Sequence, residues 1–118
     1  MLVAVSAFAI AILSGPAGQD AAAPAEPLQC TAGPVSRSFG GSDWLVYGCS
    51  DGATVVVVSA PTSAAMPFVF TLSRREAGVQ VSGEGNGDAS VTARAFEDLK
   101  KLSRQELDAL IQEAEAHP

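Results

Sequence analysis

Residues 44–60, WLVYGCSDGATVVVVSA, read as two β-strands joined at Asp51 and Gly52. Asp-Gly is a favoured two-residue hairpin turn, because both positions adopt positive φ readily. A tight turn there places apolar residues on both faces of the ribbon, so we expect it to lie centrally in a sheet that is covered on both sides. The expected opposite pairs are Cys49 with Thr54, Tyr47 with Val56, and Leu45 with Val58.

Residues 35–39 alternate like a short strand that precedes this hairpin. Residues 40–43, GGSD, are turn formers and predict a four-residue connection into Trp44. With Phe39 and Trp44 flanking that connection, Cys49 lies opposite Pro34. The segment around Cys30 is then irregular.

Two further strands are predicted after a loop bounded by Pro61 and Pro67. Residues 68–73, FVFTLS, alternate as a half-buried antiparallel strand does. A turn over residues 74–78 leads to a shorter edge strand at residues 79–82. Short connections of this kind predict an antiparallel meander of four to five strands.

The C-terminal third changes to a helical period, with an amphipathic helix expected from about residue 89. Ser103 and Glu106 form a capping-box pattern that predicts a second helix over residues 104–114. A sheet followed by two amphipathic helices is an α+β domain. The second helix is expected to bury Leu107, Leu110, Ile111 and Ala114.

Residues 2–13, LVAVSAFAIAIL, are uncharged and apolar and are followed by a helix-breaking Gly15-Pro16 pair. This pattern is typical of a secretory signal peptide, here residues 1–17 with cleavage as late as residue 23, and the run is shorter than the roughly 20 residues that span a bilayer. Residues 18–28 are rich in Ala and Pro and predict a flexible linker. We therefore expect an exported protein, periplasmic or extracellular, with a single domain over residues 29–118.

The two cysteines, Cys30 and Cys49, fit that compartment. An even cysteine count in a small exported chain predicts one disulfide, which would stabilise the fold by roughly 3 kcal/mol through the unfolded state. No C-x-x-C spacing is present, and a Cys/His metal site lacks ligands because His117 is the only histidine.

The formal net charge is -6. An acidic chain without clustered Lys and Arg is not expected to bind nucleic acid or anionic membrane surfaces. We expect a monomer without a membrane span, and any partner attracted by long-range charge would be a basic protein.

Catalytic patterns are missing from the sequence. No G-x-S-x-G motif occurs, and His117 lies one residue from the chain end, where chains fray. We therefore expect a protein that is not an enzyme, with no catalytic residue, no cofactor and no metal.

Residues 82–88, SGEGNGD, are predicted to form a loop in which polar groups converge. It is interpreted first as a glycine-rich connection in which Asp88 or Ser90 caps the following helix. Calcium binding is an alternative, although Ala89 stands where an EF-hand loop has its glycine. Contact with a partner is the third. The candidate residues for a partner or ion are Ser82, Gly83, Glu84, Asn86 and Asp88.

Residues 47–52, YGCSDG, followed by a run of valines, resemble the Y-x-C-x-x-G segment of the envelope inhibitors of C-type lysozyme. That resemblance implies a small exported β-barrel with a disulfide, and Ser82 and Gly83 would correspond to a Ser-Gly motif late in the sheet. The chain departs from the family because no Tyr closely follows Gly83 and two helices replace the closing strands. Two hypotheses follow: a non-catalytic binding protein of unknown ligand, or an inhibitor of a basic lytic enzyme such as lysozyme.

Overall fold

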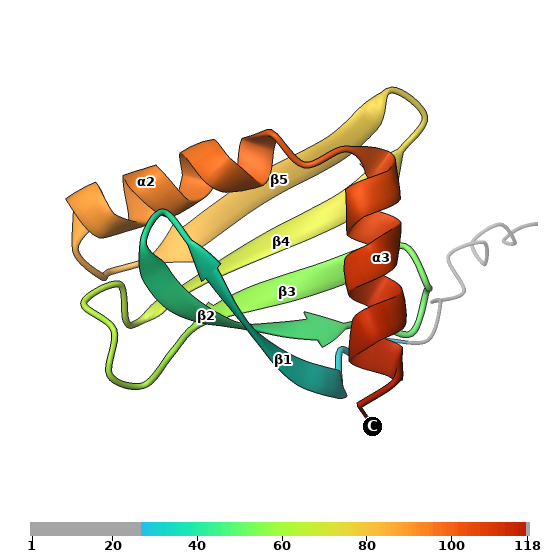
Figure 1. Cartoon of the computed structure of the whole chain (residues 1–118), viewed down its shortest axis with the longest axis horizontal. Helices are drawn as coiled ribbons and strands as arrows, with labels where there is room; N and C mark the ends of the chain where they lie inside the picture. The colour runs from blue at the N-terminus through green and yellow to red at the C-terminus, as the bar shows by residue number, and fades with distance from the viewer. Residues whose placement is uncertain (1–26, 118) are drawn as a thin grey trace, which may run out of the picture.

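The computed structural model describes residues 27–117, which form a five-stranded antiparallel sheet followed by two helices (Figure 1). This confirms the predicted α+β meander. The predicted signal peptide and nearly all of the predicted linker lie outside the described residues. The strands, in both chain and sheet order, are β1 (Ala32–Phe39), β2 (Ser42–Gly48), β3 (Thr54–Ser59), β4 (Phe68–Arg75) and β5 (Gly78–Gly85), and the helices are α2 (Ala89–Lys100) and α3 (Arg104–Glu115).

The central β2–β3 hairpin has the predicted register, with Tyr47 opposite Val56 and Leu45 opposite Val58. Its turn differs from the prediction. The Gly52 N–H donates to the Cys49 carbonyl at 3.1 Å, so Ser50 and Asp51 are the central residues of the turn, one residue earlier than expected, and Gly52 ends it with a φ of 67°.

The expected register of β1 is wrong by two residues. Phe39 pairs with Ser42, so the β1–β2 connection is the two residues Gly40 and Gly41, not four. Both glycines have positive φ, 61° and 82°, which is the backbone that a tight hairpin turn requires.

The helices cover one face of the sheet only, within the described residues, so the expected cover on both faces is wrong (Figure 1). On the covered face Trp44, Val46 and Val57 are 0% exposed. On the other face the neighbouring side chains of β2 and β3 are only half-buried. We call these the inner and outer faces. The half-buried apolar residues of the outer face are Leu45, Tyr47, Val56, Val58 and Val69.

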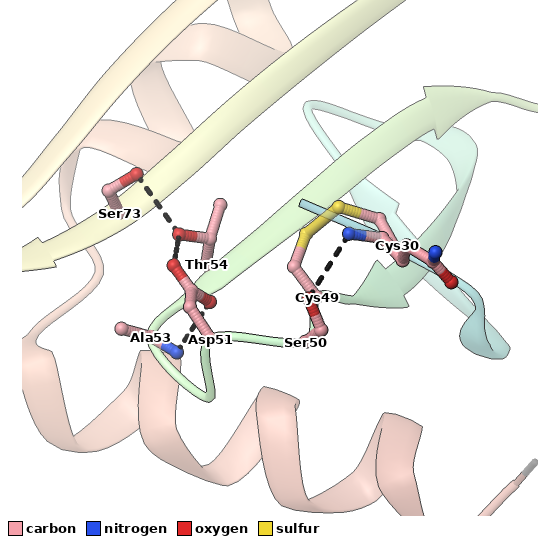
Figure 2. The surroundings of a disulfide bond; sticks show 8 residues. Cys30, Cys49, Ser50, Asp51, Ala53, Thr54 and Ser73 are labelled. Carbon is pink, nitrogen blue, oxygen red and sulfur yellow. Dashed lines mark hydrogen bonds between the residues drawn. A yellow bond between two sulfur atoms is a disulfide. The ribbon is translucent and has the colours of Figure 1, made fainter. Parts of the chain in front are cut away.

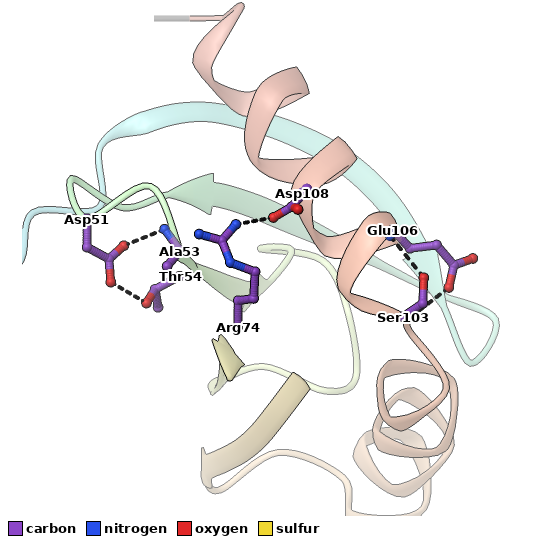
Figure 3. Close-up of polar contacts among 7 residues, drawn as sticks. All are labelled: Asp51, Ala53, Thr54, Arg74, Ser103, Glu106 and Asp108. Atoms are coloured by element: carbon purple, nitrogen blue, oxygen red, sulfur yellow. Dashed lines mark hydrogen bonds and ion pairs between the residues drawn. The ribbon is translucent and has the colours of Figure 1, made fainter. Parts of the chain in front are cut away.

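The predicted capping box at the start of α3 is confirmed (Figure 3). The Glu106 N–H donates to Ser103 Oγ at 3.1 Å, and the Ser103 N–H donates to Glu106 Oε1 at 2.8 Å. The helix buries the four predicted residues, because its apolar stripe faces the inner side of the sheet. An ion pair between Arg74 on β4 and Asp108 on α3 adds a polar link to the same face.

The disulfide between Cys30 and Cys49 is confirmed (Figure 2). It joins the segment before β1 to the end of β2, beside the turn of the central hairpin, as the sequence predicts. The Gln29 N–H donates to Ser50 Oγ at 3.1 Å, and the Ser50 N–H donates to the Gln29 carbonyl at 2.7 Å. The disulfide and these two bonds fix the first described residues to the sheet.

Candidate functional site

The candidate residues lie at one edge of the sheet, and three of them belong to a strand and not to a loop. Ser82, Gly83 and Glu84 are part of β5, because β5 continues its pairing with β4 as far as Gly85, which lies opposite Phe68. The glycine-rich composition suggested a loop, but the ladder to β4 holds these residues extended. Only residues 86–88 connect β5 to α2.

This short connection is held against the loop between β3 and β4. The Asn86 N–H donates to the Pro67 carbonyl at 2.8 Å, and the Asp88 N–H donates to the Ala64 carbonyl at 3.0 Å. Both bonds join segments about twenty residues apart in sequence, so they position the end of β5 relative to residues 61–67.

Asp88 is the N-cap of α2, as the first interpretation of this segment expected. Its Oδ1 accepts bonds from the Ser90 hydroxyl at 2.7 Å and from the Ser90 N–H at 2.9 Å. The hydrogen bond from the Ser90 side chain, followed by those from the Val91 and Ser90 backbone, lowers the pKa of Asp88 below its ordinary value. The carboxylate therefore stays ionised and is directed to the start of the helix.

The three oxygen-bearing side chains considered for calcium are placed differently from one another. Glu84 and Asn86 border a hollow at the end of the sheet, whereas Asp88 is engaged in helix capping. Within residues 27–117, no three His, Cys, Asp or Glu side chains gather as metal ligands would.

The first hollow, which we call the outer hollow, lies where β3, β4 and β5 meet residues 66–67. Its volume is ≈ 490 Å³. Apolar side chains form most of its lining, and Met66, which is 51% exposed, stands at its border. The residues that shape it are Val58, Met66, Phe68, Val69, Glu84 and Asn86.

The second hollow, which we call the inner hollow, lies between β5 and α2 and has a volume of ≈ 340 Å³. Gly83 forms part of its wall. A Cβ at Gly83 would come within 2.7 Å of ring carbons of Phe68 and Phe70, so the absence of a side chain lets the two rings reach the strand. The other residues that shape it are Val81, Thr92, Ala93 and Phe96.

The aromatic rings beneath the inner hollow form one row. The Phe68 and Phe70 ring centroids are 4.8 Å apart, and the Phe70 and Phe96 rings are 6.2 Å apart and nearly parallel. Lys100 extends over Phe96 at 4.9 Å and is paired with Glu97. The hollow thus has an aromatic floor, and the Lys100–Glu97 pair lies beside Phe96 outside its lining.

At the opposite end of the sheet, Asp51 organises the turn after β2 (Figures 2 and 3). Its carboxylate accepts from the Ala53 N–H at 2.9 Å and from Thr54 Oγ1 at 2.6 Å. Burial acts to raise the pKa of Asp51, but the bonds from Thr54 and Ala53 outweigh it and lower the pKa below its ordinary value. This carboxylate serves the turn and is far along the strands from Glu84.

The sequence indicated the strand-to-helix segment but missed most of the residues around it. Met66, Phe68 and Phe96 border the hollows because residues 61–67 and α2 pack around the end of β5. No local pattern identified Met66, whose neighbours Ala65 and Pro67 read simply as loop.

Comparison of the chain with models of known protein families, with curated proteins and with solved structures finds no match.

Proposed function

We propose that the protein is an exported, monomeric, non-catalytic binding protein, periplasmic or extracellular, that recognises a basic protein partner at β5. The observation that carries the proposal is that the exposed edge strand β5 is bordered on its two sides by hollows of ≈ 490 and ≈ 340 Å³. Concave apolar sites with a few polar groups at their border are the usual form of binding sites.

The charge near this strand supports a basic partner. Glu84 is exposed at the border of the outer hollow, and no Lys or Arg within residues 27–117 forms an ion pair with it. The whole chain carries a formal net charge of -6. A negative surface attracts positively charged partners and accelerates their association at low ionic strength.

Export is supported by two features. The disulfide between Cys30 and Cys49 is the kind of bond that persists in oxidising compartments. The apolar run at residues 2–13 has the composition of a signal peptide.

The proposal is tested by measuring the binding of a basic probe protein, C-type lysozyme, to the disulfide-bonded protein by isothermal titration calorimetry. Binding is expected at low salt, where the Debye length is about 30 Å, and weaker binding is expected near physiological salt, where it is about 8 Å. Glu84→Gln should weaken binding more than Glu115→Gln, which removes the same charge from an exposed position of α3. No binding at low salt, or equal losses in the two variants, would contradict the proposal.

Inhibition of a basic lytic enzyme is the second candidate function. Glu84 and Asn86 lie together at the border of the outer hollow, where they are available to a positively charged cleft. The resemblance of residues 47–52 to the lysozyme inhibitors points the same way. Lysozyme activity measured alongside binding separates the two: salt-sensitive inhibition lost in Glu84→Gln supports the inhibitor, whereas binding without inhibition leaves only the broader proposal.

A further inference from the structure

The outward edge of β5 carries free backbone hydrogen-bonding groups. In an antiparallel ladder, each residue directs both its N–H and its C=O to the same neighbour, and successive residues alternate in direction. The Arg74 N–H donates to the Ala53 carbonyl on the β3 side at 2.8 Å. The backbone groups of Arg74 therefore face away from Val79, its partner on β5, and Val79 forms no backbone bond to β4. The same alternation directs the backbone groups of Val79, Val81, Gly83 and Gly85 away from the sheet.

Neither Pro nor Lys protects this edge against pairing. Within the described residues β5 pairs only with β4, and the backbone groups of Val81 and Gly83 form no hydrogen bond to another element. The strand is eight residues long and its sequence, GVQVSGEG, contains no Pro and no Lys. Edge strands that must stay unpaired are usually short or carry Lys or Pro. The edge of β5 is therefore a template for a further strand.

The inner hollow lies beside this edge. Helix α2 runs along β5 on the inner face (Figure 1), and Ala93 and Phe96 of the helix line the hollow together with Val81 and Gly83 of the strand. A strand added to β5 would place alternate side chains on the inner and outer faces of the extended sheet. Side chains on the inner face would enter the hollow over the phenylalanine rings, and those on the outer face would pass Glu84.

We propose that the groove between β5 and α2 binds an extended, basic peptide segment of a partner protein as a sixth strand. One apolar side chain occupies the inner hollow, and Lys or Arg side chains on the outer face pair with Glu84. This inference rests on the proposed function, since it specifies how a basic partner is held. Strand addition gives affinity through main-chain bonds and specificity through pockets for alternate side chains.

Charge selects the occupant of the groove. At the Gly85 end of the strand, Glu84 and Asp88 are both exposed carboxylates without an ion-pair partner among residues 27–117. Near the inner hollow, the positive charge of Lys100 is already compensated by Glu97. A second copy of this acidic chain would bring further negative charge to the same place, so a basic segment is favoured.

The probe for the test is a synthetic peptide of sequence Thr-Lys-Val-Lys-Leu-Lys-Thr, in which apolar and basic side chains alternate. We expect it to bind the disulfide-bonded protein in a titration followed by amide NMR, with the largest shifts at Val79, Val81 and Gly83. Two N-methylated forms of the peptide test the main-chain bonds. One form is methylated at every second residue, and the other is methylated at the residues in between. Because an added strand uses one edge only, one form should lose binding and the other should keep it. Equal binding by both forms would overturn the proposal.

Substitutions on the strand provide the second arm. Val81→Pro removes an outward N–H that the β4 ladder does not use, so the sheet is expected to tolerate it. Val81→Ala is the control, because it shortens the side chain and keeps the N–H. Loss of one main-chain bond should weaken peptide binding by about 3- to 10-fold in Val81→Pro relative to Val81→Ala. Equal affinities in the two folded variants would count against strand addition, and if Val81→Pro does not fold, the methylated peptides decide.

Filling the inner hollow gives a third, independent result. Ala93 is exposed on α2, so Ala93→Phe occupies the hollow without entering the core, and Ala109→Phe is a matched control on α3. Peptide binding should fall only in Ala93→Phe.

Sedimentation of the unliganded protein tests whether a second copy of the chain occupies the groove. A dimer that Val81→Pro dissociates, in a protein that does not bind the peptide, overturns the proposal in favour of a second copy. Glu84-dependent lysozyme binding that Val81→Pro leaves unchanged would refute strand addition while retaining the proposed function.

Discussion

A Cβ atom at Gly87 would lie 1.7 Å from the carbonyl oxygen of Ala65, so the β5–α2 connection is seated directly on the β3–β4 loop. The same contact between the two segments is stabilised by the backbone hydrogen bonds from Asn86 to Pro67 and from Asp88 to Ala64. Two segments that border the outer hollow are thereby fixed relative to each other. The shape of that hollow depends on a contact that admits no side chain.

Gly87→Ala is expected to lower the free energy of unfolding by about 3 kcal/mol, because the backbone of Ala65 must move to admit the methyl group. Gly41→Ala is the control: no heavy atom lies within 4 Å of its new Cβ, and its cost, about 1 kcal/mol, comes only from the φ of 82°. Urea unfolding of the two variants and the parent protein measures both. Equal losses of unfolding free energy in the two variants would mean that the backbone of Ala65 moves easily to admit the methyl group.

The pKa of Asp51 predicts a loss of stability in acid. Burial acts to raise this pKa, but the bonds from Thr54 Oγ1 and the Ala53 N–H lower it below that of the unfolded chain, which is about 3.9. A depressed pKa contributes stability that is present above the unfolded value and is lost as pH falls through the folded value. The stability that the Asp51 carboxylate contributes is therefore lost below about pH 4.

Asp51→Asn keeps one acceptor oxygen and removes the titrating group. Its free energy of unfolding, measured by urea titration between about pH 6 and pH 2, should vary less steeply with pH than that of the parent protein. Since Asp51 is exposed, the difference is expected to be small and sensitive to salt. Parallel curves for the two proteins would show that the turn does not depend on the charge.

Local chemistry explains which parts of the fold were predictable. The β2–β3 register follows from the apolar segments on either side of a turn signal, and the start of α3 follows from Ser103 and Glu106. These features depend on residues a few positions apart, whose preferences act in the same direction as the packing. The register of β1 was mistaken because residues 40–43 contain four turn formers, of which only Gly40 and Gly41 form the turn.

The candidate site was predictable only in part, because it depends on contacts between distant segments. The sequence indicated residues 82–88, but glycine content alone does not show that Gly83 and Gly85 are paired with β4. The hollows require residues 61–67 and α2 to pack beside β5, and neither contact has a local signature. The half-exposed outer face was missed for the same reason. Valines on both faces of the strand predicted that both faces are covered.

The disulfide is expected to stabilise the domain by about 3 kcal/mol, since it closes a short loop in the unfolded chain. The bond spans a sequence separation of 19, and Cys49 is 4% exposed. The double variant Cys30→Ala/Cys49→Ala should therefore unfold at a lower urea concentration than the oxidised protein. A reducing agent should shift the parent protein toward the variant and leave the variant unchanged. A midpoint that does not respond to reduction would show that the bond adds no stability.

The difference between the two faces of the sheet is tested by adjacent valines of β3. Val57 is 0% exposed on the inner face, whereas Val56 is half-buried on the outer face. Val57→Thr buries a hydroxyl among apolar side chains and should cost about 1–3 kcal/mol, because the core offers the hydroxyl little compensation. Val56→Thr leaves its hydroxyl within reach of water and should cost less than about 1 kcal/mol. Thermal unfolding of the two variants compares the same chemical change on opposite faces, and equal costs would mean that the outer face is as closed to solvent as the inner one.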